Sequence, residues 1–117
     1  MKKDADLIRR IVLKMASDEH NGALKGLEGV DAEKFADHAF LLDDDGYALT
    51  RDFSPTVGKR AIIERLTSKG HDFAAELEDD TLWNEVKEKV VKPGKNWSLG
   101  VLAAVLKAAA IKQITGF

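Results

Sequence analysis

The chain has 117 residues, which is enough to bury one hydrophobic core without metals or disulfides, so we predict a single domain. Hydrophobic residues at 44% and charged residues at 32% are typical of a globular protein, and the absence of cysteine excludes a disulfide framework, a thiolate zinc cluster and a thiol nucleophile. The net charge of −2 argues against a surface built mainly for nucleic acid, because such proteins usually carry a positive excess or at least a positive face.

The first periodic segment runs from about residue 4 to residue 16. Its apolar residues recur at helical spacing, and its bases Lys3, Arg9, Arg10 and Lys14 lie mainly on the other side. We therefore predict an amphipathic helix with a basic outer face. The start of the chain lacks the unbroken apolar core of a secretory signal, and no window reaches the roughly 18 apolar residues of a membrane span. We expect a cytoplasmic protein that does not contact membranes.

Segment 17–30 contains three glycines, which disfavour a second helix, so we predict a short strand or loop there. Asp31 then has the side chain and position of a helix N-cap. The helix that it begins is expected to continue to about Asp44, before Gly46, the residue type that helix C-termini prefer.

Two short β-prone runs follow, at residues 47–50 and 61–66. The segment between them, 51–59, contains Ser54-Pro55 and Gly58, which favour turns. This pattern predicts a β-hairpin with a long tip.

Helical periodicity returns at Thr67 or Ser68. A second set of capping side chains at residues 79–81 precedes another apolar stripe, so the stretch up to Pro93-Gly94 is either one kinked helix or two. Trp83 shares this stripe with Val86 and Val90, and we expect it to be buried.

Ser98 is placed to cap a final, alanine-rich helix from about residue 99 to residue 114. Its apolar stripe either joins two copies of the chain as a homodimer or folds back onto Trp83 in a monomer. We therefore divide the chain into a domain at residues 1–92 and an added C-terminal helix at residues 93–117.

The order helix, short strand, helix, hairpin, helix is that of an α+β, winged-helix-like (helix-turn-helix-like) domain, with the hairpin as the wing. The run at residues 66–73, LTSKGHDF, looks like the stretch that joins the last wing strand to the following helix in many winged-helix regulators.

More specifically, the chain resembles the DUF2513 family of domains of unknown function, which is found largely in phages and prophages. The resemblance lies in four motifs: residues 1–9 (MKKDADLIR), His38 with the two leucines after it, residues 70–73 (GHDF) and residues 79–87 (DDTLWNEVK). It implies a winged-helix fold and a mobile-element origin, and it implies no activity.

Motifs for catalysis and for cofactors are not found. His20, His38 and His71 lie in different elements without a paired spacing, so we predict no metal site. We expect His38 to pack on its helix with locally satisfied nitrogens, and His71 either to pack or to hydrogen-bond the backbone. The acid runs at residues 43–45 and 78–80 are interpreted as solvated helix ends. No phosphate-binding loop and no nucleophile elbow is present, so we predict a protein that is not an enzyme and binds no cofactor.

Charge suggests where DNA would bind. Between residues 31 and 45, six acids and one base give a net charge of −5, and such a helix repels phosphates. Between residues 50 and 70, five bases and two acids give +3. We therefore predict a DNA-associated transcription regulator that contacts phosphates through the wing. The predicted contact residues are Arg51, Lys59 and Arg60, with Lys34, Arg9 and Arg10 from the helices.

The alternative function is a protein-binding module. Phe40 is predicted near the outer side of the acidic helix, where an apolar side chain among acids suits a protein partner better than a DNA groove. The surface would comprise Glu33, Asp37, Phe40 and Asp44, and the partner would be a basic surface of a host or phage protein that this chain inhibits or recruits. Packing of Phe40 on the wing is the competing interpretation.

Overall fold

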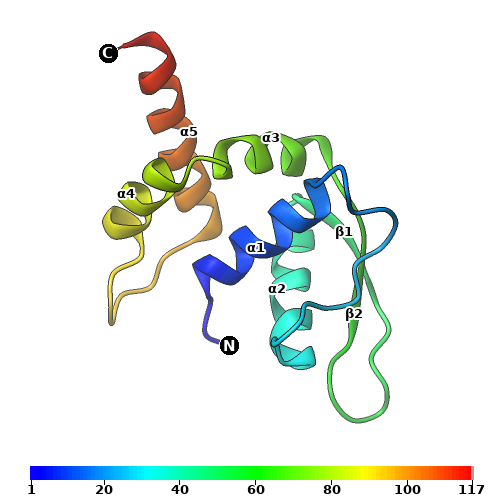
Figure 1. Cartoon of the computed structure of the whole chain (residues 1–117). Helices are drawn as coiled ribbons and strands as arrows, with labels where there is room; N and C mark the ends of the chain where they lie inside the picture. The colour runs from blue at the N-terminus through cyan, green and yellow to red at the C-terminus, as the bar shows by residue number, and fades with distance from the viewer. Residues whose placement is uncertain (117) are drawn as a thin grey trace.

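A computed structural model describes residues 1–116 of the chain, and within them it is an α+β fold of five helices and one two-stranded antiparallel sheet (Figure 1). The α+β prediction is confirmed. The elements in chain order are α1 (Ala5–Ala16), α2 (Ala32–Asp44), β1 (Ala48–Asp52), β2 (Ala61–Leu66), α3 (Ser68–Leu77), α4 (Asp80–Val90) and α5 (Leu99–Thr115).

Capping side chains set where the helices begin. A carboxylate oxygen of Asp31 accepts the backbone N–H groups of Glu33 and Lys34 at 3.1 and 3.0 Å, and Ser98 caps α5 in the same way, so both predicted N-caps are confirmed. Asp79 accepts the N–H of Leu82 at 3.0 Å. Because this cap starts a new helix, the stretch from residue 68 to residue 90 forms two helices, which decides between the two predicted alternatives.

The sheet is the predicted hairpin. β1 pairs with β2 from Asp52 opposite Ala61 to Ala48 opposite Leu66, with one bulge after Leu49. The glycine-broken segment adds a single antiparallel bridge, in which Leu24 and Ile63 exchange backbone N–H···O bonds of 2.9 Å. The predicted short strand is therefore present as one bridged residue.

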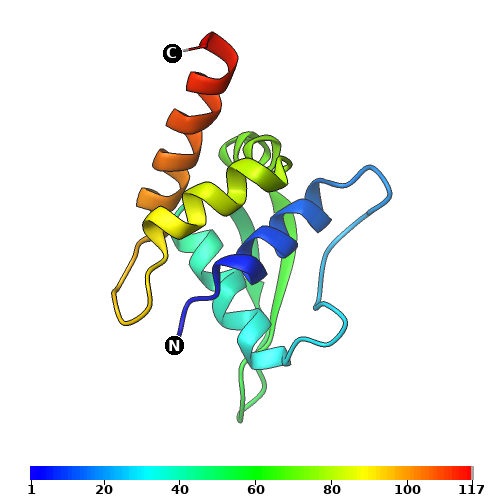
Figure 2. The same ribbon diagram turned by 60° about the vertical axis from the view of Figure 1, so that its left-hand side comes forward.

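One hydrophobic core is shared by the five helices and the inner face of the hairpin. Its fully buried side chains include Ile8 and Ile11 from α1, Phe35 and Leu42 from α2, and Ile63 from β2. Figures 1 and 2 show the hairpin loop and the end of α5 projecting from opposite ends of this packed body. Within residues 1–116, no helix is long and apolar enough to cross a bilayer.

The first half of α5 packs on α4 and α3 through three fully buried leucines, Leu99, Leu102 and Leu106. Its other side and its end are exposed, with Val101 at 53%, Ile111 at 52% and Ile114 at 85% exposure. The helix therefore folds back over α4 along half of its length only, and the remainder carries uncovered apolar side chains.

Thr67 joins the hairpin to α3. Its hydroxyl donates to the carbonyl oxygen of Gly46 at 2.6 Å and accepts the N–H of Gly70 at 3.1 Å, and its own N–H donates to the carbonyl oxygen of Tyr47 at 3.0 Å. The side chain thus caps α3 and ties that cap to the turn between α2 and β1. This is a physical reason for threonine at position 67. Glycine at position 70 has a different reason, because a β-carbon there would clash with the carbonyl oxygen of Tyr47.

Candidate functional site

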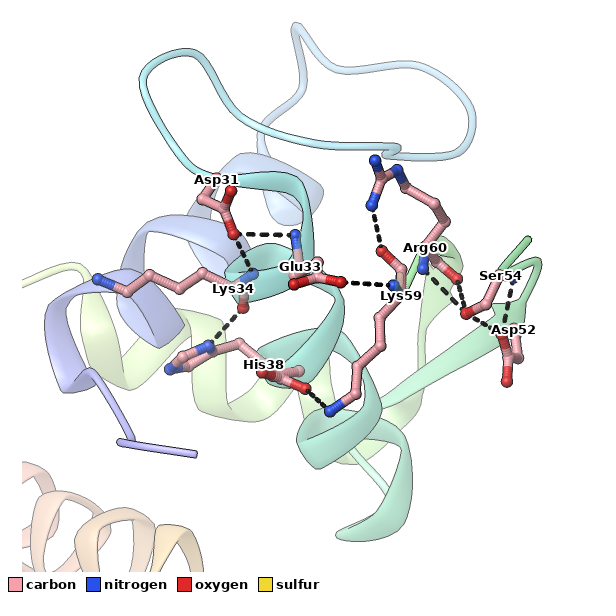
Figure 3. A network of polar contacts seen from close by, with 9 residues as sticks. Asp31, Glu33, Lys34, His38, Asp52, Ser54, Lys59 and Arg60 are labelled. Atoms are coloured by element: carbon pink, nitrogen blue, oxygen red, sulfur yellow. Dashed lines mark hydrogen bonds and ion pairs between the residues drawn. The ribbon is translucent and has the colours of Figure 1, made fainter. Parts of the chain in front are cut away.

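The wing projects from the body as an exposed loop, residues 53–60, closed at its neck by local hydrogen bonds (Figure 3). A carboxylate oxygen of Asp52 accepts the N–H of Ser54 at 2.9 Å and the hydroxyl of Ser54 at 2.6 Å. The Ser54 oxygen in turn accepts the N–H of Arg60 at 2.9 Å. These bonds hold the two sides of the neck together, so the position of Arg60 is fixed relative to β1. The two bonds from Ser54 also lower the pKa of Asp52, because each stabilises its carboxylate form.

The three predicted wing bases differ in how their charge is compensated. Arg51 pairs with Glu64 across the hairpin at 3.0 Å, with both side chains largely in solvent. Arg60 donates to the carbonyl oxygen of Lys59 at 2.7 Å, and among the described residues no carboxylate pairs with it. Arg60 is therefore the wing base whose charge is most available.

Lys59 contacts the acidic helix α2 at two points. Its backbone N–H donates to a carboxylate oxygen of Glu33 at 3.1 Å, and its ammonium group donates to Asp37 at 2.8 Å (Figure 3). The bond to Asp37 raises the pKa of the Lys59 ammonium, because it stabilises the charged form. We call Glu33, Asp37 and Lys59 the wing latch. Exposed ion pairs of this kind are weak, so the wing latch can open and re-form.

The latch changes the interpretation of the predicted protein-binding surface. Two of its four residues, Glu33 and Asp37, already bind the wing. Phe40 is half-buried and packs against the hydrophobic core. Asp44 is exposed and lies outside the ion pairs of the described residues.

Arg9 does not lie on an outer basic face, which corrects the expectation from helical spacing. Its side chain is only 18% exposed, and it donates to the carbonyl oxygen of Leu77 at 2.9 Å and to Asp80 at 2.6 Å. The guanidinium also lies 5.7 Å from the centre of the Trp83 ring. Arg9 therefore fastens α1 to the junction of α3 and α4, and phosphates cannot reach it without breaking this contact.

The other two predicted helix bases remain at the surface. Arg10 is exposed and donates to the carbonyl oxygen of Glu28 at 2.9 Å. Lys34 pairs with Asp4 at 3.0 Å, with about half of its side chain in solvent. Both can add to a positive field, and neither lies in the wing.

A groove of about 740 Å³ lies between the N-terminal segment, the start of α2 and the end of α4, with His38 among its lining residues. His38 is fully buried: its Nδ1 bonds the carbonyl oxygen of Lys34 at 2.7 Å, and its Nε2 accepts the N–H of Asp4 at 2.9 Å. This confirms the packing role predicted for His38. Burial alone would raise the pKa of Asp4, but the bonds from Lys34 and the Leu7 N–H outweigh burial and lower it. The hydrogen bonds of His38 and Asp4 therefore join the N-terminal segment to α2 in the wall of this groove.

Trp83 lies in the core, and the side chain of His71 lies at the surface. Trp83 is 1% exposed, as predicted. The side chain of His71 is exposed, so the packing role expected for it is wrong. Gly70, Phe73 and Leu77 form the inward stripe of α3, and position 71 falls outside that stripe. Within residues 1–116, no three His, Asp or Glu side chains gather in an arrangement that could hold a metal ion.

Sequence reasoning missed the neck of the wing. The signal was present, because Asp52 and Ser54 are spaced as in a turn in which an aspartate accepts the N–H two residues later. Such a turn depends only on neighbouring residues, so it predicts the hairpin neck from the sequence alone.

Comparison with known proteins identifies the family. Residues 2–96 match the family described as "Hypothetical protein (DUF2513)", which is most of the chain. The chain belongs to the DUF2513 family. The match confirms the resemblance drawn from the four sequence motifs, and it ends before α5.

One relative of this DUF2513 chain is a protein of Haemophilus influenzae described as "Uncharacterized protein". The two are 33% identical over 108 residues, which cover 90% of this chain and 92% of the relative. With this coverage, the similarity includes the wing. No solved structure matches the chain.

Proposed function

We propose that this DUF2513 protein is a phage- or prophage-borne winged-helix regulator that acts in the cytoplasm and binds DNA by contacting phosphates through its wing. The observation that carries the proposal is the projecting hairpin loop with Arg51, Lys59 and Arg60 at its base. The bridge between Leu24 and Ile63 supports the winged-helix assignment, because it adds a third strand position beside β2. The three bases are exposed, and only ion pairs and hydrogen bonds at the surface restrain them.

Sequence-independent contact is the mode that these residues suit. The outward residues of α2 are mostly acidic, so this helix would be repelled from the major groove, where base edges are read. The wing, in contrast, offers guanidinium and ammonium groups, which bind phosphate oxygens strongly. We therefore expect affinity to come from the backbone of DNA and to depend steeply on salt.

We predict that the wild-type protein binds a random-sequence DNA duplex, as measured by fluorescence anisotropy. Three phosphate contacts would make log K fall with log salt at a slope of about −2.7. Lys59→Glu with Arg60→Glu should weaken binding more than about tenfold at about 50 mM salt. Lys89→Glu with Lys92→Glu is the matched control, since these exposed lysines lie outside the wing and the change in net charge is the same.

Equal losses in both double variants, or no binding by the wild type at low salt, would contradict the wing contact. If Phe40→Ala abolishes capture of a partner protein from host lysate treated with nuclease, and the wing variant does not, the protein-binding function would replace this proposal.

We also propose that α5 joins two copies of the chain, because Val101, Ile111 and Ile114 leave apolar surface uncovered on it. Light scattering should then give twice the monomer mass for the wild type and the monomer mass for Ile111→Glu with Ile114→Glu. Gln113→Glu, on the same exposed turn, is the control and should remain dimeric. A monomeric wild type at high protein concentration would exclude this role for α5.

A further inference from the structure

The wing latch joins the two oppositely charged parts of the chain. Residues 31–45 carry a net charge of −5 and residues 50–70 carry +3, and Lys59 bonds two of the acids across 22 and 26 residues of sequence. The ammonium of Lys59 contacts Asp37 as it would contact a phosphate oxygen: a charged N–H donor meets an anionic oxygen at 2.8 Å.

The loop is shaped so that this contact can form. Gly58 adopts a φ of +91°, a conformation that L side chains rarely take. A β-carbon at this position would lie 3.1 Å from the Glu33 carboxylate oxygen that Lys59 bonds. Glycine therefore lets the backbone of the wing come close enough to α2 for both latch contacts.

We infer that Glu33 and Asp37 act as an internal substitute for DNA phosphates, which occupies Lys59 in the free protein and weakens DNA binding until phosphates displace it. This inference rests on the DNA contact proposed above. The equilibrium constant between the paired and unpaired states of an exposed ion pair is only about two to five, so phosphates can compete with the carboxylate. Asp37 is the more important acid, because it binds the charged group and its own side chain is 22% exposed.

The test compares two variants of α2 that change the net charge equally. Asp37→Asn removes the carboxylate that binds the Lys59 ammonium. Asp44→Asn is the matched control, because Asp44 is exposed on the same helix and forms none of the ion pairs of the described residues. With the random-sequence duplex, we expect Asp37→Asn to bind about two- to fivefold more tightly than Asp44→Asn. Its affinity should also fall more steeply with salt, because in Asp44→Asn salt weakens the competing Lys59–Asp37 ion pair as well as the phosphate contacts, and the two effects partly cancel.

A second measurement follows the latch without DNA. Titration of the Lys59 ε-methylene signals by NMR reports the pKa of the ammonium, which Asp37 raises. In Asp37→Asn this pKa should fall toward the ordinary value for lysine, and in Asp44→Asn it should stay near that of the wild type. Both variants change surface side chains outside the core, so loss of folding should not confuse the comparison.

The outcomes separate the inference from the proposed function. If the pKa of Lys59 does not change in Asp37→Asn, the latch is absent and the inference is wrong. If the pKa falls but both variants bind DNA equally, the latch exists without restraining DNA, and only the inference fails. If neither the wild type nor the variants bind DNA, the proposed function fails, and the inference with it, even where the pKa shows the latch. Tighter and more salt-dependent binding by Asp37→Asn alone supports both.

Discussion

Gly70→Ala is expected to destabilise the protein by about 3 kcal/mol, because the site leaves no space for a methyl group. A β-carbon built on Gly70 would lie 2.0 Å from the carbonyl oxygen of Tyr47 and 3.2 Å from the β-carbon of Leu66. The first of these neighbours is backbone, and the same oxygen accepts the N–H of Thr67 at 3.0 Å. Moving it would break the tie between the hairpin and α3, and the higher helix propensity of alanine recovers only about 1 kcal/mol.

Chemical denaturation followed by circular dichroism measures this change. Gly100→Ala is the matched control, since Gly100 is an exposed helical glycine whose added β-carbon would have its nearest neighbour, the Ser98 hydroxyl oxygen, at 3.9 Å. The control should be neutral or stabilising by up to about 1 kcal/mol. A Gly70→Ala protein as stable as the wild type would show that α3 can move away from the turn before β1, contrary to the packing described here.

Local chemistry explains why most of the fold could be predicted from the sequence. A cap such as Asp31 or Ser98 acts on N–H groups two or three residues away, so its side chain marks the start of a helix whatever the tertiary structure. The hairpin could be predicted in the same way, because β-prone runs lie on both sides of a turn-rich loop. The single bridge at Leu24 was predicted only as a strand or loop, because its pairing depends on Ile63, which is distant in sequence.

The surroundings of surface side chains were harder to predict. Helical spacing indicates on which face of a helix a residue lies, but not which other element packs over that face. Arg9 lies next to the buried Ile8, and the junction of α3 and α4 comes to cover it from about 70 residues away along the chain. The charge counts of α2 and of the wing give each region its sign, but they do not indicate that the two regions contact each other. The bond of Lys59 to Asp37 shows that these two charged regions are partners within one molecule.

This pairing also explains how a chain with a net charge of −2 can keep a basic wing. The acids of α2 lie close enough to compensate Lys59 in the free protein, and Glu64 compensates Arg51. Because both pairs are exposed, each can exchange its carboxylate for another anion at little cost in free energy. Under the proposed function, this balance of charge would set the strength of phosphate binding and leave the fold unaffected.

Trp83→Ala is expected to destabilise the protein by about 4 kcal/mol, the typical loss for a fully buried tryptophan. The ring is 1% exposed, and α1, α3 and α4 meet around it. Arg9 lies over it at 5.7 Å, and its indole N–H donates to Asp6 on α1 at 3.1 Å. Truncation would leave a cavity and release both contacts, so we expect α1 to loosen from α4.

Trp83→Phe separates the volume of the ring from its hydrogen bond. Phenylalanine fills most of the space and cannot donate, and Asp6 keeps its bonds to Lys87 at 3.1 and 3.2 Å, so no buried acceptor is left unpaired. We expect a loss of only about 1–1.5 kcal/mol for this variant, measured by the same denaturation experiment. If Trp83→Phe were as unstable as Trp83→Ala, the hydrogen bond to Asp6, rather than the packed ring, would hold α4 on α1. The small exposure of Trp83 and the larger exposure of Asp6, 65% for its side chain, favour the ring.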